Sequence, residues 1–113
     1  MKKIVFVCLG NICRSPMAEF VMKSLTDQLK IESRATSSWE HGNPIHRGTQ
    51  AIFKKYAISY DRNKTSQQIS AADFADFDYV IGMDESNVRD LKRMAPEDFQ
   101  HKIYQFEEES VPD

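Results

Sequence analysis

Residues 2–16 read KKIVFVCLGNICRSP, in which an apolar run leads into a short loop and then a proline. The run over residues 2–8 is apolar at nearly every position and rich in Ile, Val and Phe, which is typical of a strand buried on both faces of a parallel sheet. Gly10 and Asn11 both tolerate positive φ, and they interrupt the run. The apolar positions that follow Pro16 recur at helical spacing: Met17, Phe20, Val21, Met22, Leu25 and Leu29. The segment therefore predicts a strand, a loop and a helix that begins near Pro16.

The rest of the chain alternates between strand-like and helix-like segments. We predict strands over residues 31–37, 77–83 and 102–106, and helices near residues 47–56 and 84–94. Asp84 or Ser86 is a candidate cap for the last of these helices. The βαβαβαβ order predicts an α/β fold with one domain over residues 1–113. In this fold, helices flank a four-stranded parallel sheet with right-handed crossovers.

The composition narrows the class of protein. A chain of 113 residues is the usual size of one domain, and its formal net charge of −2 argues against nucleic acid as a partner. The apolar run at residues 4–9 is too short for a signal peptide or a membrane span. The two cysteines, Cys8 and Cys13, form neither a disulfide framework nor a metal site at this spacing. We therefore expect a cytoplasmic protein without a metal or a membrane partner.

The loop after the first strand has the features of an anion site. In open α/β sheets, ligands bind at the carboxyl ends of strands, where the N-terminus of the next helix adds the positive end of its dipole. Successive backbone N–H groups of such a loop can point inward and form a cradle for a dianion. The residues of the predicted phosphate-binding loop are Leu9, Gly10, Asn11, Ile12 and Cys13.

Three side chains around this loop predict phosphoryl transfer. Arg14 can bind two oxygens of a phosphoryl group with its planar guanidinium. The same positive surroundings favour a thiolate at Cys8, which makes this residue a nucleophile. Ser15 can donate a hydrogen bond to the sulfur and so stabilise it as a leaving group. The simpler interpretation, a small buried cysteine and a surface arginine, does not explain the Cys-x5-Arg-Ser spacing between a buried strand and a helix.

With these residues in view, the sequence resembles the low-molecular-weight protein tyrosine phosphatases. The resemblance is carried first by VCLGNICRSPMAE at residues 7–19. It continues through ATSSWEHGNP at 35–44, DFADFDY at 73–79, MDESN at 83–87 and SVPD at 110–113. It therefore extends over the whole chain.

The resemblance implies an enzyme that hydrolyses phosphotyrosine in proteins or peptides, and small aryl phosphates, through a phosphocysteine intermediate. Cys8 would be the nucleophile, Arg14 the phosphate clamp, and Asp113 the general acid that protonates the leaving phenol and later acts as base. No cofactor or metal is implied. Phosphate and vanadate are expected to inhibit the enzyme, and the chain is expected to be a monomer or a weak dimer.

The resemblance also assigns roles around the catalytic group. Trp39 is expected to form an aromatic wall beside the phosphoaryl ring. Asn11 and Ser33 are expected to hold the loop in shape by hydrogen bonding. Cys13 is expected to lie close enough to Cys8 for a reversible disulfide that protects the nucleophile from further oxidation.

Two features depart from the family pattern. Lys64 stands where most relatives have a histidine that supports the loop, so this support is expected to be built differently here. Family members also continue beyond the position of Asp113, so the chain is expected to be a fragment without the C-terminal segment of the family. Both departures concern the surroundings of the loop and leave its sequence intact.

Other functions share parts of this pattern. An arsenate reductase of the same fold needs a further pair of cysteines, and none follows Cys13. A protein arginine phosphatase is expected to carry Thr in place of Ile12, whose apolar side chain leaves more room for an aromatic phosphoester. A non-catalytic phosphate-binding or phosphoprotein-binding module would need the cradle but not an activated thiol. The last two remain alternatives to the favoured tyrosine phosphatase.

Overall fold

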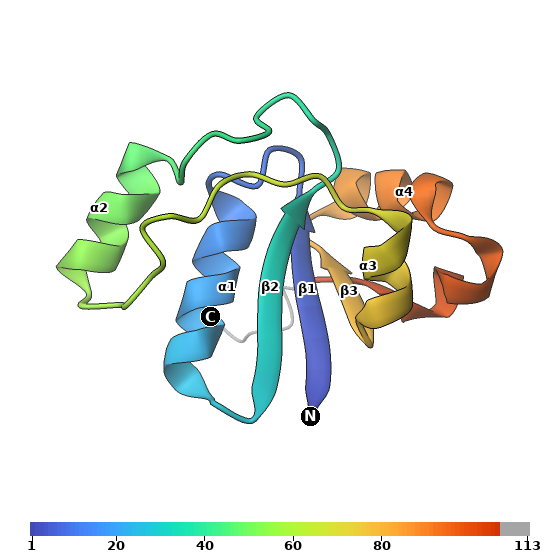
Figure 1. Ribbon diagram of the computed structural model, residues 1–113, viewed down its shortest axis with the longest axis horizontal. Coiled ribbons are helices and arrows are strands. Elements are labelled where there is room, and N and C mark those ends of the chain that lie inside the picture. The colour runs from blue at the N-terminus through green and yellow to red at the C-terminus, as the bar shows by residue number, and fades with distance from the viewer. Residues whose placement is uncertain (107–113) are drawn as a thin grey trace.

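Four parallel strands form one sheet in the computed structural model, which describes residues 1–106 of the chain (Figure 1). The strands are β1 (Lys2–Cys8), β2 (Leu29–Ala35), β3 (Tyr79–Gly82) and β4 (Ile103–Gln105), and their order across the sheet is β2-β1-β3-β4. In the register of the sheet, Val7 of β1 lies opposite Arg34 of β2 and Gly82 of β3. The predicted α/β class and the four-stranded parallel sheet are confirmed.

Helices pack on both sides of the sheet. In Figure 1, α1 (Arg14–Leu25) and α2 (Arg47–Lys55) lie on one side, and α3 (Ala71–Asp76) and α4 (Glu85–Met94) on the other. Two buried apolar clusters hold these layers together. The larger includes Val5, Val7, Val80, Phe74 and Leu91, and the smaller consists of Phe20, Ile45 and Phe53. Each such buried side chain stabilises the fold by about 1.5–3 kcal/mol. The larger cluster fixes the sheet beneath the loop that follows β1, and the smaller one joins α2 to α1.

The first helix is shorter than its sequence pattern predicts. The apolar spacing extends it to Leu29, whereas α1 ends at Leu25 and Leu29 begins β2. Thr26 has an extended backbone, and its hydroxyl accepts a hydrogen bond from the N–H of Gln28 at 3.1 Å. A local side-chain bond of this kind competes with helical hydrogen bonding, so it ends the helix without Gly or Pro.

Other boundaries also differ from the prediction. The strands β3 and β4 are shorter than predicted, and β2 begins two residues earlier than the predicted 31–37. Two short helical segments were not predicted, α3 and the 3-10 helix η1 (Glu97–Lys102). A capping box between Ser70 and Asp73 starts α3, a signal that needs no long apolar pattern. Within residues 1–106, no helix is long and apolar enough to cross a membrane.

Candidate active site

The loop that joins β1 to α1 lies at the carboxyl edge of the sheet, beside the end of β2 (Figure 1). Four of its carbonyl groups accept hydrogen bonds from residues outside the loop. The donors are Thr36 N–H to Cys8, Ser37 N–H to Leu9, His46 N–H to Ile12 and the Ser66 hydroxyl to Gly10, at 2.9, 3.2, 2.7 and 2.7 Å. In a trans peptide the N–H points away from the carbonyl, so the N–H groups that follow these carbonyls point into the loop. Such a set of inward donors suits an anion.

Asn11 gives the loop its sharp turn. Its φ of 56° lies in the left-handed region, and the residue is buried. Its backbone N–H donates a hydrogen bond to Cys8 Sγ at 3.2 Å. Gly10 also tolerates a positive φ but does not adopt one, and Gly42 is the only described glycine that does. Asn tolerates this conformation better than most side chains do, and its amide also holds the surrounding residues.

The sulfur of Cys8 lies in a buried hydrogen-bond network. Ser15 Oγ is 3.0 Å from Cys8 Sγ, and both residues are almost completely buried. The side-chain amide of Asn11 donates to the hydroxyls of Ser15 and Ser33, at 2.9 Å each. When Cys8 is a thiolate, the Ser15 hydroxyl and the Asn11 N–H are both placed to donate to it. This is the arrangement that stabilises a negative sulfur at the end of a strand and the start of a helix.

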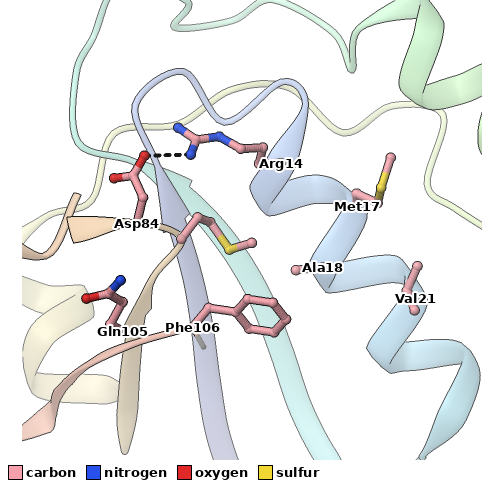
Figure 2. A pocket seen from close by; sticks show the side chains of 8 residues that line it. Arg14, Met17, Ala18, Val21, Asp84, Gln105 and Phe106 are labelled. Atoms are coloured by element: carbon pink, nitrogen blue, oxygen red, sulfur yellow. Dashed lines mark hydrogen bonds and ion pairs between the residues drawn. The ribbon is translucent and has the colours of Figure 1, made fainter. Parts of the chain in front are cut away.

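Arg14 binds a carboxylate at the edge of the loop. Its Nη1 donates to Asp84 Oδ2 at 2.7 Å, as Figure 2 shows. Asp84 is the N-cap of α4 and also accepts bonds from the Asn87 N–H and the Ser86 hydroxyl. Burial raises the pKa of Asp84, but the hydrogen bonds from Arg14, Asn87 and Ser86 outweigh it and lower the pKa to about 2. The hydrogen bond to Asp84 is likewise the main cause that raises the pKa of Arg14.

A cavity of about 550 Å³ lies next to this ion pair (Figure 2). Arg14 and Asp84 line its polar end, and apolar side chains from α1 line one wall, among them Met17 and Val21. Phe106 lines the opposite side. Cys8 is not among the described residues that line this cavity.

The other predicted site residues lie at separate places around the loop. Trp39 is 80% exposed, so its ring is open to solvent. Ser33 is buried within the network below the loop. Cys13 is exposed and its sulfur accepts a hydrogen bond from the Thr49 hydroxyl at 3.3 Å. Asp113 lies outside the described residues. Within residues 1–106, no group of three His, Cys, Asp or Glu side chains is placed to hold a metal ion.

Sequence reasoning missed several residues that support the loop. The pairing of Asp84 with Arg14 had a usable signal, because Asp84 follows a strand that neighbours β1 and so lies at the same edge of the sheet. Glu19, which is only 2% exposed and is bound by Lys64, had a weaker signal. A carboxylate on the buried face of a helix needs a partner, but the sequence does not name that partner.

Comparisons with known proteins agree on one family. Residues 3–110 match the family model described as low molecular weight phosphotyrosine protein phosphatase. Low molecular weight protein-tyrosine-phosphatase PtpA of Staphylococcus epidermidis is 44% identical over the whole chain, which covers 78% of that protein. PtpA of Staphylococcus aureus is 45% identical with the same coverage.

A solved structure leads to the same result. The low molecular weight protein tyrosine phosphatase SP-PTP from Streptococcus pyogenes superposes with a TM-score of 0.93 and is 63% identical in sequence. The match covers all of this chain and 77% of that one. The chain therefore belongs to the low molecular weight phosphotyrosine protein phosphatase family.

Proposed function

We propose that this protein hydrolyses phosphotyrosine in proteins or peptides, and small aryl phosphates, through a phosphocysteine intermediate at Cys8. Membership of the family makes it a protein-tyrosine-phosphatase. The observation that carries the proposal is the position of the Cys8 sulfur, 3.2 Å from the Asn11 N–H and 3.0 Å from the Ser15 hydroxyl. A sulfur with two donors at the base of a loop of inward N–H groups is ready to act as a thiolate on a phosphoryl group held above it.

The first chemical step transfers the phosphoryl group to the enzyme. The backbone N–H groups of residues 9–13 bind the oxygens of the phosphate, and Cys8 Sγ attacks phosphorus. The S–P bond forms as the bond from phosphorus to the phenolic oxygen breaks. Asp113 gives its proton to the departing phenolate, which is a poor leaving group without one.

The second step returns the enzyme to its starting state. The Asp113 carboxylate takes a proton from water, whose oxygen attacks phosphorus as the S–P bond breaks. The sulfur leaves as a thiolate and accepts hydrogen bonds from Ser15 and Asn11. Because charge is spread over the three equatorial oxygens in both steps, most of the catalysis comes from donors that are already in place.

Arg14 serves as the phosphate clamp in this mechanism. Asp84 engages Nη1, and the Nε and Nη2 edge of the same planar group remains available for two phosphoryl oxygens. Asp84 then orients the guanidinium while the phosphate binds. Trp39, which is largely exposed, offers a ring face to the phosphoaryl group on the outer side of the site.

The same site supports several narrower proposals. Phosphate and vanadate compete with the substrate, since recognition is mainly of the phosphoryl group. Cys8 and Cys13 are both free thiols, and a Cys8 sulfenic acid formed by peroxide condenses with the Cys13 thiol to a disulfide and water.

We place the protein in the cytoplasm, as one domain over residues 1–113, acting as a monomer or a weak dimer.

The test is hydrolysis of an aryl phosphate by the purified protein, with and without a metal chelator. Wild type should turn over in both conditions, and Cys8→Ser should not. Rapid acid quenching should trap phosphate on Cys8 of the wild type. Phosphate binding without turnover or trapping would instead indicate a binding module, and faster turnover of a phosphoarginine peptide than of a matched phosphotyrosine peptide would indicate an arginine phosphatase.

A further inference from the structure

A side chain holds the Gly10 carbonyl, whereas backbone N–H groups hold the other three outward carbonyls of the loop. The Ser66 hydroxyl donates to the Gly10 carbonyl at 2.7 Å. Ser66 is 1% exposed, so water cannot take the place of this donor without rearrangement. A backbone donor is supplied by any residue except proline, but this bond depends on the identity of residue 66.

The peptide unit between Gly10 and Asn11 connects Ser66 with the Cys8 sulfur. Its carbonyl accepts the Ser66 hydroxyl, and its N–H donates to Cys8 Sγ at 3.2 Å. The carbonyl and the N–H point in opposite directions, because the peptide is trans. A bond that fixes the carbonyl outward therefore also fixes the N–H inward, on the sulfur.

This peptide unit has a second orientation within reach. Gly10 has no positive φ and Asn11 has a φ of 56°, which is the combination found at the two central residues of a type II turn. Rotation of the central peptide converts such a turn into type I, in which both residues have a negative φ. The rotation would relieve the left-handed conformation of Asn11, which is costly for a residue with a side chain. Contacts from outside the loop must therefore oppose it.

The segment that opposes the rotation is itself anchored. The Ser66 N–H donates to the Asn43 carbonyl at 2.8 Å, and the Ser66 carbonyl accepts the Gly42 N–H at 2.9 Å. The Gln67 N–H donates to Asn11 Oδ1 at 3.2 Å, and the Gln67 carbonyl accepts an N–H from the end of β2 at 2.8 Å. Two neighbouring residues thus hold the carbonyl of the peptide unit and the side chain that follows it.

We propose that Ser66 is a positioning residue that locks the Gly10–Asn11 peptide in the orientation needed for catalysis. The reversed peptide would place a carbonyl oxygen, in place of an N–H, against the Cys8 thiolate and the bound phosphate. Both of these are negative, so the reversed form neither activates the sulfur nor binds the anion. Ser66 thereby sets the fraction of the free enzyme that is competent. This inference rests on the proposed function only for its effect on turnover.

Alkylation of Cys8 measures this fraction without turnover. We compare wild type and Ser66→Ala by the rate at which iodoacetamide modifies Cys8 at about pH 6, and by the concentration of inorganic phosphate that halves this rate. Peptide mass spectrometry separates Cys8 from the exposed Cys13. Ser66→Ala should slow alkylation by about 2- to 12-fold, the value of one neutral hydrogen bond. The protecting phosphate concentration should rise by the same factor, because both quantities depend on the same fraction.

Kinetics with an aryl phosphate give a second signature of the same equilibrium. The bound phosphoryl group selects the competent orientation, so Ser66→Ala should raise KM by this factor and leave kcat nearly unchanged. Ser66→Thr keeps the hydroxyl and should retain most of the wild-type behaviour. Ser59→Ala, which removes an exposed serine hydroxyl, is the matched control and should behave as wild type. If Ser66→Ala does not fold, Ser66→Val and Ser66→Thr are compared, since they have the same shape and only threonine donates.

Nuclear magnetic resonance observes the peptide itself. Without phosphate, the Asn11 amide resonance of Ser66→Ala should lie away from its wild-type position. Saturating phosphate should remove most of this difference, because it returns the variant to the competent orientation. A merely structural role of Ser66 would leave the difference in place.

The outcomes separate this inference from the proposed function. Equal alkylation rates and equal protection by phosphate in wild type and folded Ser66→Ala would overturn the role of Ser66. Slower alkylation with unchanged protection, or an amide difference that phosphate does not remove, would overturn it as well. Wild type that binds phosphate but neither turns over nor forms a phosphoenzyme would instead overturn the proposed function, and the effect of Ser66 on the sulfur would stand.

Discussion

Replacing Ser15 with Ala removes one of the two donors to the Cys8 sulfur. The hydroxyl is 3.0 Å from Sγ, and Ser15 is fully buried, so no water can take its place without rearrangement. A hydrogen bond to a charged group is worth about 1.5–3 kcal/mol, which corresponds to about a 10- to 150-fold change in rate. The sulfur carries most charge when it leaves phosphorus, so breakdown of the phosphocysteine should slow more than its formation.

Pre-steady-state hydrolysis of p-nitrophenyl phosphate measures this difference. Ser15→Ala should release a burst of nitrophenol equal to the enzyme concentration and then turn over at least tenfold more slowly than wild type. Ser24→Ala, which removes an exposed hydroxyl from the same helix, is the matched control. If folded Ser15→Ala keeps kcat within twofold of wild type, the sulfur does not depend on this hydroxyl and the argument from the contact fails.

Four further predictions concern other contacts of the site. Asn11→Ala should lower the free energy of unfolding by at least about 1 kcal/mol, because alanine is strained at the left-handed φ of 56°. Asn11→Gly should regain this backbone part of the stability but should not regain turnover. A fully active Asn11→Gly would contradict the role of the side-chain amide. Asp84 has a pKa of about 2 against an ordinary 3.8, so its stabilising effect is complete above about pH 4 and is lost as the pH falls through 2. Because its side chain is 42% exposed, we expect the Asp84 carboxylate to contribute only about 0.5–1 kcal/mol to the free energy of unfolding. Urea unfolding should therefore show that wild type loses stability between pH 4 and pH 2 and that Asp84→Asn does not lose this part. Equal acid sensitivity in both proteins would refute the prediction. Asp84→Asn should also raise KM for aryl phosphates several-fold, because Arg14 loses its charged partner. After peroxide treatment and thiol reduction, wild type should regain its starting activity and Cys13→Ser should not; equal recovery would exclude the disulfide.

The sequence was sufficient for the fold class because its signals are local and strong. The buried run of β1 and the proline-started helix define a strand–loop–helix unit, and the later strands repeat the same apolar signature. The misplaced end of α1 shows the limit of this approach. Apolar spacing continues to Leu29, but a side-chain bond at Thr26 ends the helix, and apolar residues of the next strand complete the pattern by coincidence.

In the candidate site too, the local features could be predicted from the sequence and the distant contacts could not. The loop residues from Cys8 to Ser15 are contiguous, so their chemistry could be inferred from spacing alone. The partners of Glu19 and Arg14 come from segments far along the chain, and pairing across such distances depends on the packing of α1 against β2 and on the position of α4. The sequence marked Lys64 as a departure but did not indicate that it binds a buried carboxylate.

The four outward carbonyls of the loop have a consequence for the surface segments that bind them. The donors come from three separate places in the sequence, namely residues 36–37, His46 and Ser66, and all of them bind the same short loop. Surface connections usually accept insertions and deletions readily. Here a change of even one residue in length would withdraw a donor from the loop and free a carbonyl that now points away from the loop's inward N–H groups. These connections are therefore constrained in length much as a strand is constrained in register.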